Sequence, residues 1–311
     1  MIGEESLSYQ ERDWEIVDYQ AYDLDDTGLT LRGPRPTHLP PGGYVACVGA
    51  AQTYGCFCEW PYPRILEQRL GVPFFNLGVA GAGPSFFVSH ARVLPYLERA
   101  RLVIIQVMSG RSESNSEFDT GGLEQVTRRC DGARLAAERA YAELLNGSTA
   151  WWPFPRGRGT IARVQRLARR RRVRAAVRES RQNWVEGYRA LFAAIAAPKI
   201  LYWFSKRTPD YVERYNDVRE LFGEFPQLID RETFRRITPF ADHTVLCVSS
   251  RGSPQRLVSR FTGMPTTIDP ARADGKTSEH RHAYDYYYPS PEMHVDGADA
   301  LETACRRFLV G

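Results

Sequence analysis

Five short apolar runs, separated by stretches with helical spacing, constrain the fold of this chain more than any other feature of its sequence. The runs cover residues 44–49, 73–77, 102–108, 199–205 and 244–249. Apolar runs of this length that alternate with helices are typical of βαβ units, in which the strands pair in parallel. We therefore expect a mainly parallel sheet between two helical layers, a three-layer α/β domain of flavodoxin-like type.

The rest of the chain is organised around this pattern. Residues 1–43 are polar and rich in proline, and they end in the breaker Pro40-Pro41-Gly42-Gly43. We expect them to be a lead-in to a domain that covers 44–311. Between the third and fourth runs, about 119–196, we expect a helical insertion. The helices themselves are expected at about 63–70, 85–99, 123–145, 160–196 and 293–309.

Two absences indicate where such a chain works. No stretch has the roughly 18 to 20 consecutive apolar residues that a membrane-spanning helix needs, and residues 1–15 are acidic without the apolar core of a secretory signal. We therefore expect a cytoplasmic protein without a membrane span. The six cysteines are scattered along the chain, so we expect reduced thiols rather than a disulfide framework.

Chemistry-bearing residues gather in the loops after the strands, where open parallel sheets bind their ligands. The first loop is Gly49-Ala50-Ala51-Gln52-Thr53-Tyr54-Gly55 and the second runs from Asn76 to Gly83. The third runs from Ser109 to Asn115, and the segment Tyr288-Pro289-Ser290-Pro291-Glu292-Met293-His294 opens the last helix.

In this order the four segments resemble the sequence blocks of the SGNH, or GDSL, hydrolase superfamily. Those blocks are Gly-Asp-Ser-x-Thr-x-Gly, Asn-x-Gly-x-x-Gly, Gly-x-Asn and Asp-x-x-His. The matching residues are Gly49, Thr53 and Gly55 in the first block, Asn76, Gly78 and Gly81 in the second, and His294 in the last. The longer run, with Phe204-Ser205, also resembles a bacterial domain family of unknown function with this layout. The resemblance implies an SGNH-type α/β fold and a hydrolase or transferase activity.

The departures from these blocks decide which chemistry to expect. The family's aspartate and nucleophilic serine fall on Ala50 and Ala51, its oxyanion-hole asparagine on Arg111 or Ser112, and its last aspartate on Pro291. An acyl-enzyme mechanism needs a nucleophile beside a base. We therefore expect no serine esterase, but an enzyme that acts by direct transfer or hydrolysis on an anionic or carbohydrate-linked small molecule.

Four residues are the candidate catalytic groups. His294 is the expected general base, and Gln52, Thr53 and Arg111 are expected to stabilise developing negative charge. Each has a plainer alternative. His294 can cap or pack at a helix start, Gln52 and Thr53 can cap the first helix, and Arg111 can pair with Glu113 or Glu292.

The expected substrate-binding residues lie in the same loops. Glycines there allow a ligand to approach the backbone closely, and arginines after successive strands would form an electropositive mouth that suits phosphate, sulfate or carboxylate. The expected set is Gly49, Ala51, Gly78, Gly81, Gly83, Ser109, Arg207 and Arg251.

No cofactor is required by this chemistry. A similar layout occurs in a polysaccharide acetyltransferase-like family that binds coenzyme A, so the resemblance makes acyl-CoA, or a sulfate donor, a possible co-substrate. His280 and His282 have no acidic or cysteine partner nearby, so we expect no metal site.

A basic block leaves two further functions open. Residues 158–181 contain ten arginines and one glutamate, a net charge of +9 in a chain of net charge +4, so the remainder carries about −5. Apolar residues at helical spacing within it predict an amphipathic helix with a solvated basic face. The alternatives to an enzyme are a catalytically inactive binding module, and nucleic-acid or anionic-surface binding through this helix. Nucleic acid is the less expected partner, because no recognised motif accompanies the arginines.

Overall fold

The expected parallel sheet forms the centre of the molecule. The computed structural model describes residues 9–147, 160–269 and 282–309. The five strands of the sheet are β3 (Val45–Gly49), β4 (Phe74–Gly78), β5 (Leu102–Gln106), β9 (Lys199–Ser205) and β10 (His243–Val248). They lie in the order β10-β9-β5-β3-β4, and each neighbouring pair is parallel. The chain passes from β3 to β4 at one edge and then crosses to β5 on the other side of β3, so the winding reverses between β3 and β5.

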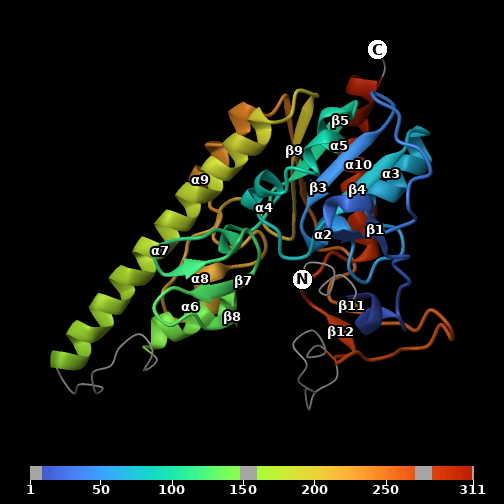
Figure 1. Ribbon diagram of the computed structural model, residues 1–311. Coiled ribbons are helices and arrows are strands. Elements are labelled where there is room, and N and C mark those ends of the chain that lie inside the picture. Colours follow the sequence, from blue (N-terminus) through green and yellow to red (C-terminus); the bar gives the residue numbers. More distant parts are fainter. Residues whose placement is uncertain (1–8, 148–159, 270–281, 310–311) are drawn as a thin grey trace.

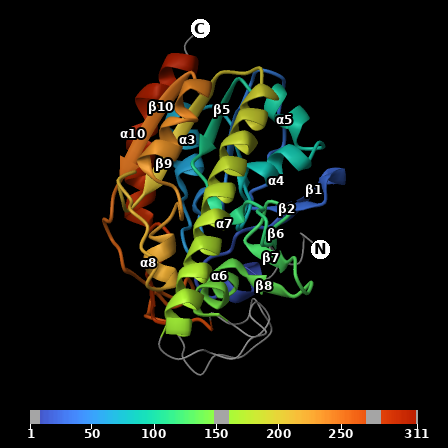
Figure 2. The same ribbon diagram turned by 90° about the vertical axis from the view of Figure 1, so that its left-hand side faces the viewer.

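Helices cover both faces of this sheet (Figures 1 and 2). One face packs against α4 (Pro84–Ser89), α5 (Leu94–Glu98) and the C-terminal half of α7 (Thr160–Ala193). The other packs against α3 (Tyr62–Leu70) and α10 (Pro291–Leu309). Alternate residues of each buried strand enter opposite cores, as the two-residue period of a strand requires.

The insertion differs from its prediction in its first half. The predicted helix over 123–145 is wrong there, because the chain forms an antiparallel sheet of β6 (Phe118–Asp119), β7 (Gln125–Arg128) and β8 (Arg134–Ala136). The turn between β7 and β8 contains Asp131 and Gly132, and Gly132 has a φ of 73°. An Asp-Gly pair is a strong hairpin signal. The helical part is α6 (Ala137–Asn146), followed by α7, which confirms the helix predicted from residue 160 onward.

The lead-in is built into the molecule. Residues 9–13 are helical, and β1 (Tyr22–Leu24) and β2 (Leu29–Leu31) form a hairpin. Arg32 is buried and donates to four backbone carbonyls, those of Tyr54, Gly55, Cys58 and Glu59. This residue therefore ties the lead-in to the loop after β3.

Shorter elements complete the chain. They are α2 (Ala51–Tyr54), α8 (Val218–Phe222), α9 (Arg231–Arg235), β11 (Gln255–Arg256), β12 (Tyr284–Asp285) and the 3-10 turns η1 (Asp25–Thr27), η2 (Gly110–Ser112) and η3 (Thr238–Phe240). Within the described ranges, no helix combines the length and the apolar character that crossing a membrane requires.

Candidate functional site

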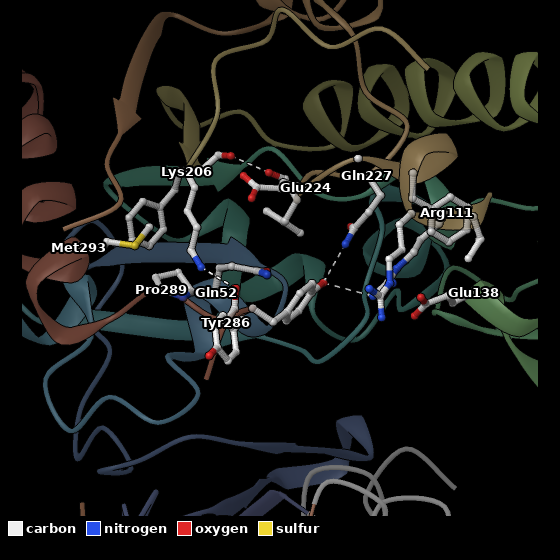
Figure 3. Close-up of a pocket in the computed structure, with 17 residues that line it drawn as sticks. Gln52, Arg111, Glu138, Lys206, Glu224, Gln227, Tyr286, Pro289 and Met293 are labelled. Atoms are coloured by element: carbon white, nitrogen blue, oxygen red, sulfur yellow. Dashed lines mark hydrogen bonds between the residues drawn. The ribbon is translucent and has the colours of Figure 1, made fainter. Parts of the chain in front are cut away.

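A cleft opens at the carboxyl ends of β3 and β5, where the winding of the sheet reverses and ligands of open parallel sheets bind. It has two adjoining compartments, a larger one of about 570 Å³ and a smaller one of about 270 Å³. Figure 3 shows the larger compartment. The residues that line both are Gln52, Arg111, Glu138, Phe225 and Tyr287.

Gln52 reaches the cleft because α2 lies tightly on the sheet. A Cβ atom on Gly49 would come within 2.2 Å of the Thr53 hydroxyl oxygen, so only glycine permits this approach. The Gln106 Oε1 atom accepts hydrogen bonds from the Ala50 N–H at 3.0 Å and the Thr53 hydroxyl at 2.7 Å. The Gln52 side chain, in contrast, is only 2% exposed, and neither its nitrogen nor its oxygen meets hydrogen-bond geometry with a partner among the described residues. Its polar neighbour is the Tyr287 hydroxyl, whose pKa burial raises and the Gln52 side chain partly lowers.

Arg111 is presented by the turn η2 after β5. The Ser109 hydroxyl accepts from the Arg111 N–H at 3.2 Å, and the Ser112 hydroxyl donates to the Gly81 carbonyl at 2.7 Å. The guanidinium pairs through Nη2 with Glu124, not with Glu113 or Glu292, and its buried Nε has no partner in the described part of the chain. Burial alone would lower the pKa of Arg111, but neighbouring acidic groups, Tyr287 and Glu124 first, raise that pKa above its ordinary value. Arg111 is therefore a fixed cation whose buried Nε donor is left for a ligand.

Tyr287 stands between the two compartments and joins the loops around them. Its hydroxyl accepts from Arg111 Nη2 at 3.2 Å and from Gln227 Nε2 at 3.1 Å, as the dashed lines in Figure 3 mark. Asp285 fixes the turn that places the ring, because its carboxylate accepts from the backbone N–H groups of Tyr287 and Tyr288. The Gln227 Oε1 atom is buried without a partner in the described residues, so it is a fourth polar atom open to a ligand, after the two amide atoms of Gln52 and Arg111 Nε.

The larger compartment combines apolar walls with charged groups. Its apolar lining consists of Phe204, Val218, Phe222, Phe225, Tyr286, Pro289 and Met293. Lys206 and Glu224 also line it, and the Lys206 ammonium donates to the Tyr286 carbonyl at 2.6 Å (Figure 3). Burial lowers the pKa of Lys206 from its ordinary value. Such a compartment suits a molecule with an apolar face and a few polar groups.

The structure places His294 behind the cleft rather than in it. The imidazole has no exposed surface, stands beside the rings of Tyr62 and Phe204, and lines neither compartment. Its Nδ1 atom accepts from the Tyr62 N–H at 3.2 Å, so the proton of the neutral ring lies on Nε2, which has no partner in the described chain. Burial, with a contribution from the charge of Arg32, lowers the pKa of His294 to about 3. In this arrangement the ring has no free lone pair with which to accept a proton.

The other residues expected in the loops divide into two groups. Ala51, Gly81 and Ser109 line the smaller compartment beside Gln52 and Arg111. Thr53, Gly49, Gly78 and Gly83 instead serve packing. The Thr53 hydroxyl bonds Gln106, and a Cβ on Gly78 would meet the Tyr54 backbone nitrogen at 2.2 Å. The backbone N–H groups of residues 78 and 83, expected to face a substrate, donate to Asn76 and Gly122.

Arg207 and Arg251 are not brought to the cleft. Arg207 donates to the carbonyls of Glu224, Pro226, Ile229 and Thr208, so it holds the loop that carries Gln227. Burial lowers the pKa of Arg207 to about 10. Arg251 pairs with Asp296 on α10 and donates to the Glu292 carbonyl. The contacts of Arg207 occupy the Nε and both Nη atoms that an anion would need, and Arg251 lines neither compartment.

Several lining residues were not singled out from the sequence, above all Gln227, Tyr287 and Glu138. The run Tyr286-Tyr287-Tyr288 directly before the last block was an available signal for one of them. Gln227 lies in a loop without a recognisable pattern. His280 falls outside the described residues, and within the described ranges no three potential metal ligands gather.

Comparisons with known proteins give a family without a known activity. Residues 7–309 match the family described as "Domain of unknown function (DUF6473)". No curated protein matches the chain. One similar solved structure is a carbohydrate esterase family 2 enzyme plus carbohydrate-binding domain from Corynascus thermopiles (Myceliophthora fergusii), with 12% identity and a TM-score of 0.40 over 91% of this chain and 70% of that one. Another is a Lactobacillus plantarum protein, with 13% identity and a TM-score of 0.34 over 87% of this chain and 99% of that one.

Proposed function

The chain belongs to the family described as domain of unknown function DUF6473, and on that premise we propose that it binds an anionic, carbohydrate-linked small molecule in the cleft between β3 and β5. The binding needs no nucleophile of the protein. Gln52 and Gln227 recognise hydroxyl groups, Arg111 recognises the negative charge, and the aromatic walls pack against the apolar face of the sugar ring.

The buried, unpaired amide of Gln52 carries this proposal. A buried polar group without a partner costs about 1–3 kcal/mol of stability, and Gln52 leaves both its donor and its acceptor unpaired among the described residues. Arg111 Nε adds a donor and Gln227 Oε1 an acceptor in the same cleft. A ligand that offers hydroxyl groups next to an anion satisfies this mixture of donors and acceptors better than an apolar ligand does.

The same residues argue against covalent catalysis. Of the serines that line the cleft, Ser205 and Ser112 donate to backbone carbonyls, and Ser109 caps the turn that carries Arg111. His294 lines neither compartment. A serine mechanism needs a hydroxyl within hydrogen-bond reach of its base, and this pairing does not occur among the described residues of the cleft.

Direct transfer between two bound molecules is the second candidate function. The observation that favours it is the division of the cleft into two compartments that share Arg111 and the carboxylate of Glu138. A donor such as an acyl-CoA or a sulfate donor in one compartment would meet an acceptor hydroxyl in the other. The hydroxyl oxygen would bond to the acyl or sulfuryl group as the bond from that group to the donor breaks. The bonding electron pair would leave with the rest of the donor, as the thiolate in the case of acyl-CoA. Glu138 would accept the proton of that hydroxyl, and Glu138→Gln would then abolish turnover while leaving binding in place.

Calorimetric titration with glucose 6-phosphate and glucuronate tests the proposed binding, with glucose and inorganic phosphate as the separate halves of the first probe. We expect both anionic sugars to bind more tightly than glucose or phosphate alone. Equal or weaker binding of the anionic sugars would show that the ligand class is wrong.

The variant Gln52→Leu separates a binding role from a structural one. We expect it to weaken binding of the anionic sugar by about tenfold or more, while the melting temperature stays equal or rises, because leucine removes an unpaired buried amide. The matched control is Gln106→Leu, which removes an amide that holds α2 and should lower the melting temperature. A lower melting temperature with unchanged binding in Gln52→Leu would make Gln52 a structural residue.

A further inference from the structure

Residues 163–178 of α7 present a basic face that the cleft does not use. We define this α7 basic face by six arginines whose side chains are exposed or partly exposed: Arg163, Arg166, Arg170, Arg171, Arg174 and Arg178. Their spacing of three, four and one residues places them on one side of an α-helix. Figure 2 shows α7 across the front of the molecule, with no labelled element over it.

Acidic groups of the described chain pair with other arginines of the helix and leave this face positive. Arg172 pairs with Glu117, and Arg181 pairs with Glu213 and Asp230. The one acid of the stretch, Glu179, accepts from the Ser116 N–H at 2.7 Å. For the six arginines of the α7 basic face, the described part of the chain supplies no carboxylate within ion-pair distance, and the Arg174 guanidinium lies over the Tyr215 ring.

Two large aliphatic side chains lie exposed among these arginines. Val164 is 59% exposed and Leu167 is 53% exposed. Leu167 lies one turn after Arg163, and Val164 lies two turns before Arg171, so both belong to the same side of the helix. Exposed aliphatic groups add nothing to a contact with phosphates alone, whereas they gain free energy by entering the boundary between lipid headgroups and acyl chains.

We propose that the α7 basic face binds the surface of an anionic phospholipid bilayer. The arginines are attracted to the negative headgroups, each by about fivefold in affinity, and they keep their heads in the headgroup layer while their stems lie along apolar surface. Val164 and Leu167 insert shallowly between the headgroups. This inference is independent of the ligand in the cleft.

Flotation with lipid vesicles tests the proposal on the full chain. We expect the protein to float with vesicles of phosphatidylcholine mixed with phosphatidylglycerol, not with vesicles of phosphatidylcholine alone, and to lose binding as salt is raised. Replacing four arginines (Arg163→Gln, Arg166→Gln, Arg170→Gln and Arg171→Gln) should weaken this binding by about 100-fold or more.

The control variant removes the same charge from exposed arginines elsewhere: Arg134→Gln, Arg235→Gln, Arg236→Gln and Arg307→Gln. It should bind nearly as well as the parent chain. Equal losses in the two variants would show that net charge, and not the α7 basic face, is responsible. Circular dichroism and the melting temperature check that both remain folded.

A second variant, Val164→Ser with Leu167→Ser, changes no charge. It tests the proposal independently if the four-site variant does not fold. We expect it to weaken vesicle binding about tenfold.

A gel-shift assay with a DNA duplex identifies the competing partner. The proposal would be overturned if the parent chain binds the duplex tightly but does not float with the anionic vesicles, and if the variant Val164→Ser with Leu167→Ser binds the duplex equally well.

Discussion

At the scale of single residues, two buried glutamines show how the site differs from the scaffold. Gln106 uses its Oε1 atom to hold α2 against the sheet, whereas Gln52 has both amide atoms unpaired among the described residues. The sequence predicts Gln52 because it stands where the first helix should begin, in the loop after the first strand. It could not predict Gln227, because the hydroxyl that orients this side chain belongs to Tyr287, sixty residues away along the chain.

A pH-dependent stability is predicted for His294. The native state keeps the imidazole neutral down to about pH 3, whereas the unfolded chain protonates it near its ordinary pKa of 6.5. Between these two pH values the unfolded state binds more protons, so the free energy of unfolding falls as the pH falls below 6.5. At about pH 5 the loss due to this group is about 2 kcal/mol.

The variant His294→Gln tests this, since its amide oxygen can still accept from the Tyr62 N–H. Urea unfolding should show that the variant loses about 2 kcal/mol less than the parent chain between about pH 8 and pH 5. At about pH 8 the imidazole of the parent chain is neutral in both the folded and the unfolded state. The difference in the free energy of unfolding between the parent chain and the variant at this pH therefore measures packing alone. An unchanged pH dependence would mean that His294 titrates in the native state and remains a candidate base.

At the scale of elements, apolar strands were predictable and the segments that rely on turns or distant contacts were not. The strands β3, β4, β5 and β9 are nearly continuous apolar runs because both of their faces are covered. The edge strand β10 is also apolar, but its residues Leu246 and Val248 are exposed. The strands β7 and β8 are short, and their pairing depends on the Asp131-Gly132 turn. The loop at 223–230 has no such local signal, since Arg207 shapes it from the end of β9.

We predict that this loop depends on the fork of the Arg207 guanidinium. Arg207→Lys keeps the charge, but an ammonium has three donors on one atom and cannot reach the four carbonyls together. The free energy of unfolding should fall by about 2 kcal/mol, and binding of an anionic sugar should weaken as Gln227 loses its position.

Arg251→Lys is the matched control, because that arginine forms an exposed pair with Asp296. Water and salt screen an exposed ion pair, so it contributes little to stability, and urea unfolding should barely change. Equal effects of the two substitutions would contradict the special role of Arg207.

At the scale of the whole molecule, the lead-in is part of a hydrophobic core and packs against segments from both ends of the described chain. Tyr9, Ile16, Val17 and Tyr19 form a buried cluster with Tyr54 and Phe57 of the loop after β3 and with Leu257 and Ile268 near the other end of the chain. The sequence did not predict this, because a polar, proline-rich segment shows no periodicity when its few apolar residues are buried by distant partners. The Tyr9 hydroxyl also lies 3.0 Å from that of Tyr288, so the segment borders the smaller compartment.

The last prediction tests this view with two aromatic residues of the same segment. Tyr19 is fully buried, donates to Asp13 and accepts from the Phe57 N–H, whereas Trp14 is 46% exposed and stacks on Arg260. Tyr19→Ala should lower the free energy of unfolding by about 3–5 kcal/mol, since it leaves a cavity and unpaired partners. Trp14→Ala should cost about 1 kcal/mol or less, because water already reaches much of the indole. Urea unfolding followed by circular dichroism measures both values. If Tyr19→Ala unfolds at the same urea concentration as the parent chain, the lead-in is an appendage, and the cleft forms without it.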